Sequence, residues 1–342
     1  MTSILQRGLR RKLTLTSALA LLLAAGVTLA PRQLRADQTE PSYTCVATTG
    51  MVADIARSIA GENGDITGLL GEGVDPHLYK LTRSDMAQLM RADAVFYSGL
   101  LLEGKMSDAF IRIAGSGKPV FAVTENIDEQ YLLEPEQFQG HFDPHVWMDP
   151  TAWSRCAAVV ADKLATRIDP SNAEQYESNL KKYLEGLAEL DEYVERIIGT
   201  IPEDRRVLIT AHDAFNYFGR RYGLEVMGIM GISTESEAGV REIERLVDIL
   251  VEQQIPAVFV ETTVPDRSVK ALIAGARARG HEVVIGGSLF SDAMGAPGTY
   301  EGTYIGMIDH NATIIARALG GSAPARGMQG KLTGDGAHGE GN

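Results

Sequence analysis

The chain is divided near its middle by the stretch SNAEQYESNLKKYLEGLAELDEYVERII, residues 171–198. Its apolar side chains recur at steps of three and four, the spacing that places them along one face of an α-helix. They are Tyr176, Leu180, Tyr183, Leu187, Leu190, Tyr193 and Ile197. Asp169-Pro170 supplies a start signal, and a helix over 171–198 would be about 40 Å long at 1.5 Å per residue. The pattern predicts a long linking helix over 169–200.

A single amphipathic helix of this length also fits a coiled-coil dimer. Here the helix lies inside sequence in which short strands alternate with helices on both sides, so a brace between two lobes is the favoured interpretation. The chain is accordingly predicted to be a monomer. A rigid connecting helix also predicts only modest movement of the lobes against each other.

Strands and helices alternate on both sides of this helix. Before it, strands are predicted over 43–48, 65–70, 94–98 and 120–123, and helices over 51–60, 82–91 and 106–114. After it, strands are predicted over 207–210, 225–230, 257–261 and 282–285, and helices over 214–222, 237–253, 268–279 and 305–319. This alternation is typical of parallel βαβ units. We therefore expect an α/β fold of two Rossmann-like lobes, 42–168 and 204–320, and a glycine-rich disordered tail over 321–342.

The first 36 residues differ from the rest. Four basic residues within 7–12 precede an apolar run over 13–30, and Leu34-Arg35-Ala36 resembles a cleavage site. This arrangement predicts a secretory signal peptide over 1–36 and a periplasmic location for the mature chain. An uncleaved anchor is the alternative interpretation, because the run is nearly as long as the roughly 20 residues that span a bilayer. No cysteine follows the run, which argues against a lipid-anchored start.

The net charge and the two cysteines indicate which partners and which cysteine state to expect. The 342 residues carry a formal net charge of −13, which argues against nucleic acid as a partner. A solvated acidic surface is the simple explanation of this charge, and attraction of cations is the second. Export permits a disulfide between Cys45 and Cys156. A buried free thiol is nevertheless the favoured state of Cys45, which falls in a predicted strand.

Two Asp-Pro-His tripeptides are the features from which a binding site is predicted. They occupy residues 75–77 and 143–145. Proline fixes its own φ and restricts the residue before it, so each imidazole is presented on a stiff loop. Two such presentations in one chain indicate two halves of one site.

Two further side chains in the second half of the chain complete the expected set. His212 directly follows strand 207–210, and Asp292 follows strand 282–285 and a Gly286-Gly287 turn. In open parallel sheets, ligands lie beyond the carboxyl ends of strands. Two facing lobes would therefore bring together His77, His145, His212 and Asp292. Three imidazoles and a carboxylate suit zinc or manganese, and because the imidazoles must be neutral, binding should weaken as the pH falls through about 6 to 6.5.

Each of these residues also has a simpler interpretation. A lone loop histidine is more often a surface or capping residue, and Asp292 could cap the segment that follows it. Asp75 and Asp143 are expected to orient their loops rather than to bind metal. His141 is expected to be solvated. Glu261, at the end of a predicted strand, is equally consistent with supporting a ligand and with attracting cations.

Longer motifs carry a resemblance to a known family. They are DPHLYKLTRSDMAQLMRADAVFYSGLLLEG at 75–104, DPHVWMDP at 143–150, TAHDAFNYFGRRYG at 210–223, FVETTVP at 259–265, and GGSLFSDAMG at 286–295 with GTYEGTYIGM at 298–307. Together they cover much of residues 42–320. Over this range the chain resembles the zinc- and manganese-binding solute-binding proteins of ABC importers.

That resemblance implies two α/β lobes joined by a rigid helix, one divalent ion held between them, and a permease in the inner membrane as partner. Matched motif by motif, it assigns the metal ligands to His77, His145, His212 and Asp292. The family's manganese-dedicated branch has Glu where this chain has His212, so the chain is similar to the three-histidine branch, which serves zinc and manganese. Many zinc-dedicated members carry a long histidine-rich loop before the second ligand. Here the loop over 124–142 is short and holds only His141.

The predicted function is capture of zinc or manganese and its delivery to an ABC-type permease, without enzymatic activity. A zinc-dependent hydrolase is one alternative, but four protein ligands leave no open coordination position, and the sequence has no His-Glu-x-x-His motif. A cell-surface adhesion role is the other alternative, and no stretch of the sequence encodes an adhesive surface. The residues do not separate zinc from manganese or iron.

Overall fold

The N-terminal lobe is built on a four-stranded parallel sheet in a computed structural model that describes residues 41–333. The strands lie in the order β2-β1-β3-β4. They are β1 (Tyr43–Ala47), β2 (Gly64–Gly68), β3 (Ala94–Tyr97) and β4 (Val120–Ala122), connected by helices α1 (Gly50–Ala60), α2 (Arg83–Arg91) and α3 (Ser107–Gly115). Cys45, Val46 and Ala47 of β1 are consecutive and all buried. Burial on both faces is expected of a central parallel strand that helices cover on each side.

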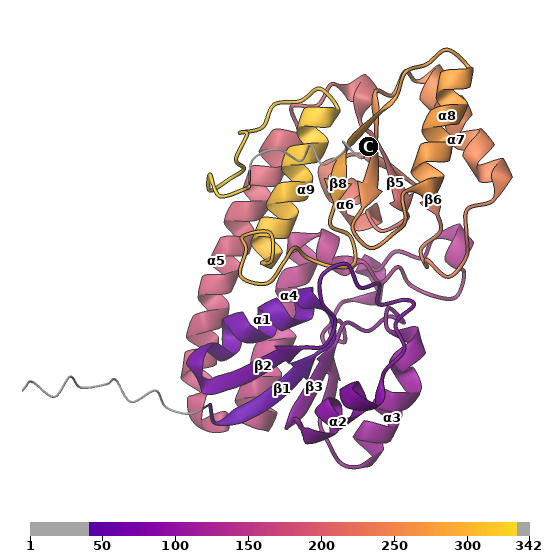
Figure 1. Cartoon of the computed structure of the whole chain (residues 1–342). Coiled ribbons are helices and arrows are strands. Elements are labelled where there is room, and N and C mark those ends of the chain that lie inside the picture. The colour runs from indigo at the N-terminus through magenta and orange to yellow at the C-terminus, as the bar shows by residue number, and fades with distance from the viewer. Residues whose placement is uncertain (1–40, 334–342) are drawn as a thin grey trace, which may run out of the picture. The chain divides into compact units, whose positions relative to one another are not determined.

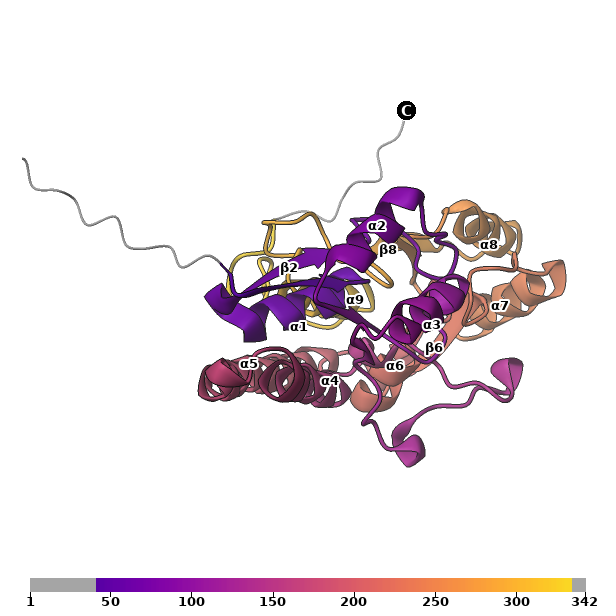
Figure 2. The same ribbon diagram turned by 90° about the horizontal axis from the view of Figure 1, so that it is seen from below.

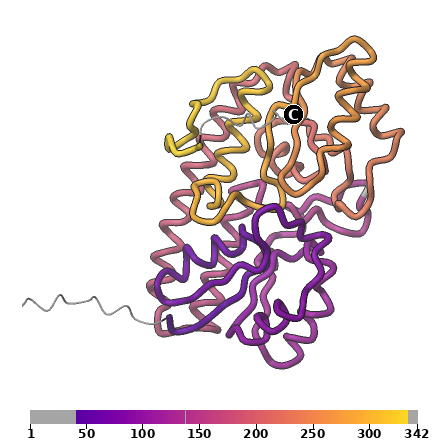
Figure 3. The backbone as a smooth tube through the Cα atoms, in the orientation of Figure 1, coloured from indigo at the N-terminus to yellow at the C-terminus, as the bar shows by residue number. Residues whose placement is uncertain are grey.

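The C-terminal lobe contains two parallel two-stranded ladders. β5 (Val207–His212) pairs with β6 (Glu225–Met230), and β7 (Ala257–Glu261) pairs with β8 (Val284–Leu289). Helices α6 (Asn216–Tyr222), α7 (Val240–Glu252) and α8 (Arg267–Ala278) connect or cover them. β5 lies beside β7, so the two ladders place their strand ends together. In Figure 3 the indigo-to-magenta trace forms one lobe and the orange trace the other.

A layer of helices joins the lobes. α5 (Ala173–Ile198) packs against α1, α4 (Pro150–Lys163) and α9 (Tyr304–Ala318). Figure 1 shows α5 running alongside both lobes, and Figure 2, from below, shows α4 next to it. The predicted apolar stripe is the packed face of α5, where Tyr176, Leu187 and Leu190 are buried. The α/β class, the parallel sheets and the long helix are therefore confirmed.

Helix α4 was missed by the sequence analysis. Its start is encoded in the second half of DPHVWMDP, where the Asp149 side chain accepts hydrogen bonds from the backbone of Thr151 and Ala152 and Pro150 occupies the first turn. Trp153 on α4 is fully buried and stacks on Tyr304 with ring centroids 5.6 Å apart. This stack joins α4 to the start of α9.

The two cysteines of the chain are both buried and free. Cys45 lies in β1, and Cys156 lies in α4. Burial raises the pKa of the Cys45 thiol to about 12, so the thiolate is suppressed. The expectation of a free buried thiol at Cys45 is confirmed.

Two local predictions were wrong. The Gly286-Gly287 pair lies inside β8 rather than in a turn after a strand. A Cβ atom added to Gly287 would lie 2.6 Å from Ile314, which shows how closely this strand approaches α9. The tail was also misjudged, because residues 321–333 pack on the fold, with Leu332 only 4% exposed. Residues 334–342 lie outside the described part of the chain, as does the predicted signal peptide over 1–36.

Asp309 on α9 holds this C-terminal segment in place. Its carboxylate accepts hydrogen bonds from the Met328 backbone N–H at 2.9 Å, the Tyr300 hydroxyl at 3.0 Å and the Thr313 hydroxyl at 3.1 Å. Nearby, Glu301 accepts from the backbone of Thr333 at 2.9 Å. The segment is glycine-rich, but these fixed acceptors bind the backbone N–H groups of Met328 and Thr333, which composition alone does not reveal.

We expect Asp309→Ala to lower the free energy of unfolding by about 1–3 kcal/mol, because it leaves buried donors without an acceptor. The segment over 321–333 should also become sensitive to proteases. Chemical denaturation and limited proteolysis measure the two effects. Asp266→Ala is the control, since Asp266 lies at the surface in an exposed pair with Lys270. Unchanged stability and unchanged cleavage of the Asp309 variant would contradict the proposed anchoring.

Among the helices that the structure describes, none combines the length and the apolar content needed to cross a bilayer.

Candidate metal centre

Four side chains from distant parts of the sequence meet between the lobes. One atom from each of His77, His145, His212 and Asp292 lies within 4.8 Å of the others. All four are buried: His77 is 5% exposed and Asp292 is 2% exposed, while His145 and His212 are fully buried. The four residues selected from the sequence are the ones that the fold brings together.

The two Asp-Pro-His tripeptides form the same local turn. Asp75 Oδ1 accepts a hydrogen bond from the His77 backbone N–H at 2.8 Å, and Asp143 Oδ1 accepts from that of His145 at 3.0 Å. An Asp side chain that bonds the backbone two residues later closes an Asx turn, and the proline between them stiffens it. The prediction that both aspartates orient their loops is confirmed.

His212 and Glu261 are the last residues of β5 and β7, which lie side by side. The Glu261 carboxylate accepts from the His212 backbone N–H at 2.8 Å and contacts the ring Nδ1 at 2.5 Å. Asp143 makes the equivalent contact with Nδ1 of His145 at 2.7 Å. A ring that donates from Nδ1 to its carboxylate has only Nε2, the atom that faces the centre, available to bind a metal once that nitrogen is deprotonated. Glu261 therefore holds the backbone and the ring of His212.

Asp292 is held by its neighbours in the chain rather than by bonds to its own carboxylate. The backbone carbonyl of Ser291 accepts a hydrogen bond from the indole N–H of Trp147 at 2.9 Å, and the Tyr304 hydroxyl donates to the carbonyl of Trp147 at 2.7 Å. This chain of contacts fixes the loop after β8 against the DPHVWMDP segment. Tyr304 thus packs beneath the centre.

Three of the inward-facing atoms lack hydrogen-bond partners in the described structure. They are Asp292 Oδ1 and Oδ2 and His212 Nε2. The Nε2 atoms of His145 and His212 each lie 3.3 Å from an Asp292 oxygen, and those of His77 and His145 are 3.4 Å apart. Four donors at 2.0–2.1 Å from a tetrahedral zinc ion would be about 3.3 Å from one another. Buried polar atoms are rarely left unpaired. Both the lack of partners and the spacing of these atoms fit a shared cation.

Burial and neighbouring charges shift the pKa values of the three histidines in different directions. Burial lowers the pKa of His77 to about 4, against the opposing effect of Asp292. Burial also opposes protonation of His145, but Asp143 and Asp292 outweigh it and raise the pKa of His145 to about 9. Glu261 and Asp292 likewise outweigh burial at His212 and hold its pKa well above its usual value. Without a metal ion, we therefore expect His145 and His212 to be positively charged at neutral pH and His77 to be neutral.

Known proteins are similar to this chain in both sequence and fold. Residues 45–318 match the model of the family described as "Zinc-uptake complex component A periplasmic". The chain belongs to this family. It is 47% identical over 273 residues to the manganese-binding lipoprotein MntA of Bacillus subtilis (strain 168), a match that covers 80% of this chain and 88% of MntA. It is 44% identical over 274 residues, with the same coverages, to the zinc-binding protein TroA of Treponema pallidum (strain Nichols).

The solved structure of the family member TroA from Treponema pallidum has the same fold. It superposes with a TM-score of 0.78 at 44% sequence identity, covering 81% of this chain and 99% of that one. The family consists of substrate-binding transport proteins rather than enzymes. The predicted family, the two-lobed fold and the absence of an enzymatic role are therefore confirmed.

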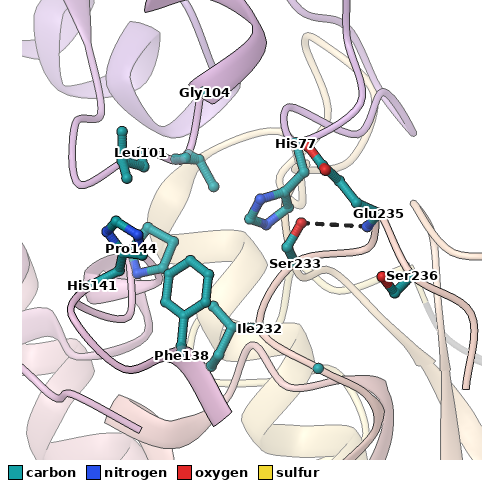
Figure 4. A pocket seen from close by; sticks show the side chains of 12 residues that line it. His77, Leu101, Gly104, Phe138, His141, Pro144, Ile232, Ser233, Glu235 and Ser236 are labelled. Atoms are coloured by element: carbon teal, nitrogen blue, oxygen red, sulfur yellow. Dashed lines mark hydrogen bonds between the residues drawn. The ribbon is translucent and has the colours of Figure 1, made fainter. Parts of the chain in front are cut away.

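A cavity of about 480 Å³ opens beside the centre of this family member (Figure 4). The N-terminal lobe contributes Leu101, Phe138 and His141 to its wall, and the C-terminal lobe contributes the segment around Ser233. Of the four central residues, His77 alone lines it. His141 is exposed, as expected, and its ring packs against Phe138 on the cavity wall rather than pointing into the cluster.

Proposed function

We propose that this chain binds one divalent transition-metal ion, zinc or manganese, through His77, His145, His212 and Asp292. It carries the ion as cargo to the permease of an ABC importer. The observation that supports this best is the set of inward-facing donor atoms, which are buried and face one centre without other partners. No residue in this set has a catalytic role in the proposal.

The charge of the ligand set suits a buried divalent ion. Three neutral imidazoles and one carboxylate reduce the charge of a 2+ ion to +1, and the adjacent Asp143 and Glu261 add two further negative charges. Burial of a charge is costly unless it is compensated in this way. The Nδ1 contacts of His145 and His212 hold the two rings in the tautomer that presents Nε2 to a metal.

The donor set accepts either ion. Zinc is satisfied by four nitrogen and oxygen ligands. Manganese favours oxygen donors, and both oxygens of Asp292 lack other partners. Relatives named as a manganese-binding and a zinc-binding protein are 47% and 44% identical to this chain, so similarity does not favour one ion. The proposal therefore covers both.

We infer that the protein acts in the periplasm as a monomer, after export directed by residues 1–36. The family is described as periplasmic, and the manganese-binding relative is named a lipoprotein. Both support a location outside the cytoplasm. Fractionation of cells expressing the chain, together with N-terminal sequencing of the mature protein, tests export and cleavage after Ala36. Recovery of the uncleaved chain in the membrane fraction would favour the anchor instead.

Elemental analysis of protein purified without added metal, followed by calorimetric titration, tests the proposed function. We expect one zinc or manganese ion per chain. Ligand binding to the folded state alone stabilises it by RT ln(1 + [L]/Kd), about 2.7 kcal/mol at 100 times Kd. A thermal melt with and without ion should therefore show a clear rise in Tm. A chain that binds neither ion, and melts identically in their presence, would rule out the function.

A further inference from the structure

His77 is anchored differently from the other two histidines. His145 and His212 are tied through ring Nδ1 to Asp143 and Glu261. Within residues 41–333, no side chain forms a hydrogen bond to Nδ1 of His77. Its described anchor is the bond from its backbone N–H to Asp75. The ring that lines the cavity is therefore the one that depends most on the position of its loop.

Asp75 is itself held by the opposite lobe. Its Oδ1 accepts from the His77 backbone, and its Oδ2 accepts from the Thr234 hydroxyl at 2.5 Å. Thr234 belongs to the segment 231–239 that connects β6 to α7. Thr234 itself is only 8% exposed. One carboxylate thus connects His77 in the N-terminal lobe to Thr234 in the C-terminal lobe.

A second contact between the lobes lies next to the first. Glu235 Oε1 is 2.9 Å from Lys105 Nζ, and Lys105 belongs to the turn that precedes α3. Glu235 and Ser233 both line the cavity beside His77, as Figure 4 shows. Both side chains of this ion pair are partly exposed, so solvent and salt weaken it. The Thr234 contact is less exposed than this ion pair and should be the stronger of the two.

We propose that Thr234 is a positioning residue that keeps His77 at the metal centre by way of Asp75, and that segment 231–239 thereby controls release of the ion. This inference rests on the proposed function. Without the hydroxyl, Asp75 still bonds the His77 backbone but loses its hold on the other lobe. The 75–79 loop gains freedom, His77 leaves the centre more often, and the ion exchanges through the adjoining cavity.

Zinc release from the purified protein tests this directly. The loaded protein is mixed with excess chelator, and the release rate is followed by stopped flow. Thr234→Val keeps the shape of the side chain and removes the donor, and we expect release about tenfold faster, the lower end of the effect of outer contacts on metal affinity. Thr234→Ser keeps a hydroxyl and should restore the slow rate. Ser236→Ala, in the same segment and on the same cavity wall, is the matched control and should release at the wild-type rate.

Two further measurements separate positioning from general destabilisation. The Tm of metal-free Thr234→Val should stay close to that of the metal-free wild type. In a His77→Ala background, adding Thr234→Val should leave the release rate unchanged, because the residue through which it acts is gone. Acceleration that persists in this background would overturn the inference.

The outcomes also distinguish the inference from the function on which it rests. A wild-type protein that binds no zinc would refute the proposed function. A wild type that binds zinc, with Thr234→Val releasing it at the same rate, would refute only the role of Thr234.

Discussion

Binding of one zinc ion should release about two protons per chain at pH 7, and the apparent affinity should fall about 100-fold for each pH unit between pH 8 and 6. The reason is the protonation of the metal-free centre. The pKa of His145 is raised to about 9 and that of His212 lies well above its usual value, so both rings are charged at neutral pH. Each Nε2 must lose its proton before it can bind a metal. Every proton displaced contributes a factor of ten per pH unit.

Charge balance explains why this exchange is favourable in a buried site. With both rings protonated, His145 and His212 contribute +2, while Asp143, Glu261 and Asp292 contribute −3. Replacing the two protons by a divalent ion leaves the same net charge of −1. The cluster therefore keeps the same net charge in both states, and in each state the buried positive charge faces carboxylates. The burial that lowers the pKa of His77 to about 4 keeps this third ring neutral and ready to bind.

The same shifts set the pH dependence of stability. A folded-state pKa of about 9 for His145, against an unfolded value near 6.5, stabilises the metal-free fold below pH 6.5. That contribution is lost as the pH rises from 6.5 through 9. The metal-free protein should therefore lose stability over this range while metal binding strengthens. The rise in Tm on adding zinc should be larger at pH 8 than at pH 6.

Calorimetric titration in buffers of different ionisation enthalpy counts the released protons. Glu261→Gln is the informative variant, because it removes the charge that does most to raise the pKa of His212. Proton release from this variant should fall by up to one per ion at pH 7. Asp266→Asn, which changes an exposed carboxylate of the same lobe, should release the wild-type number. An affinity that does not change between pH 8 and 6 would contradict the assignment of charge to these rings.

The sequence identified the four residues that meet between the lobes because their signals are local. An Asp-Pro-His turn is closed within three residues, and the structure shows the same closure at Asp75 and Asp143. His212 could be placed at a strand end because 207–210 is a short apolar run, and the rule for parallel sheets then located the strand end at a cleft. Unperturbed imidazoles suggest that binding weakens at about pH 6 to 6.5, whereas the raised pKa values of His145 and His212 predict weakening from a higher pH. The carboxylates that raise the pKa of His145 and His212 take effect only once the chain is folded.

Other features depended on contacts between distant segments. Glu261 could be placed at the end of β7, but its contact with His212 becomes visible only when β5 and β7 lie side by side. Thr234 lies in a stretch without periodicity, and nothing near it in the sequence points to Asp75, 159 positions earlier. Helix α4 was missed although Asp149-Pro150 is a good start signal, because the adjoining histidine motif was interpreted as a loop. Glycine content similarly obscured the packing of residues 321–333 on Asp309.

His212→Ala should weaken zinc binding by at least about 1,000-fold, more than the 10- to 100-fold that loss of an outer contact costs. The substitution removes a ligand, and it leaves Glu261 buried without its ring partner. Competition against a chelator of known affinity measures the loss. His141→Ala is the matched control, because His141 is also a histidine near the centre but is exposed on the cavity wall. A loss of similar size in both variants would show that the central cluster is not the binding site.

A double-mutant cycle then tests how Glu261 contributes. Glu261→Gln alone should weaken binding about 10- to 100-fold, because the ring of His212 loses its charged acceptor. If Glu261 acts only through that ring, adding Glu261→Gln to His212→Ala should cost nothing further. The coupling free energy would then be about 1.4–2.8 kcal/mol, well above the few tenths expected of independent sites. Additive losses would instead mean that Glu261 attracts the cation directly, the alternative that its place in the sequence left open.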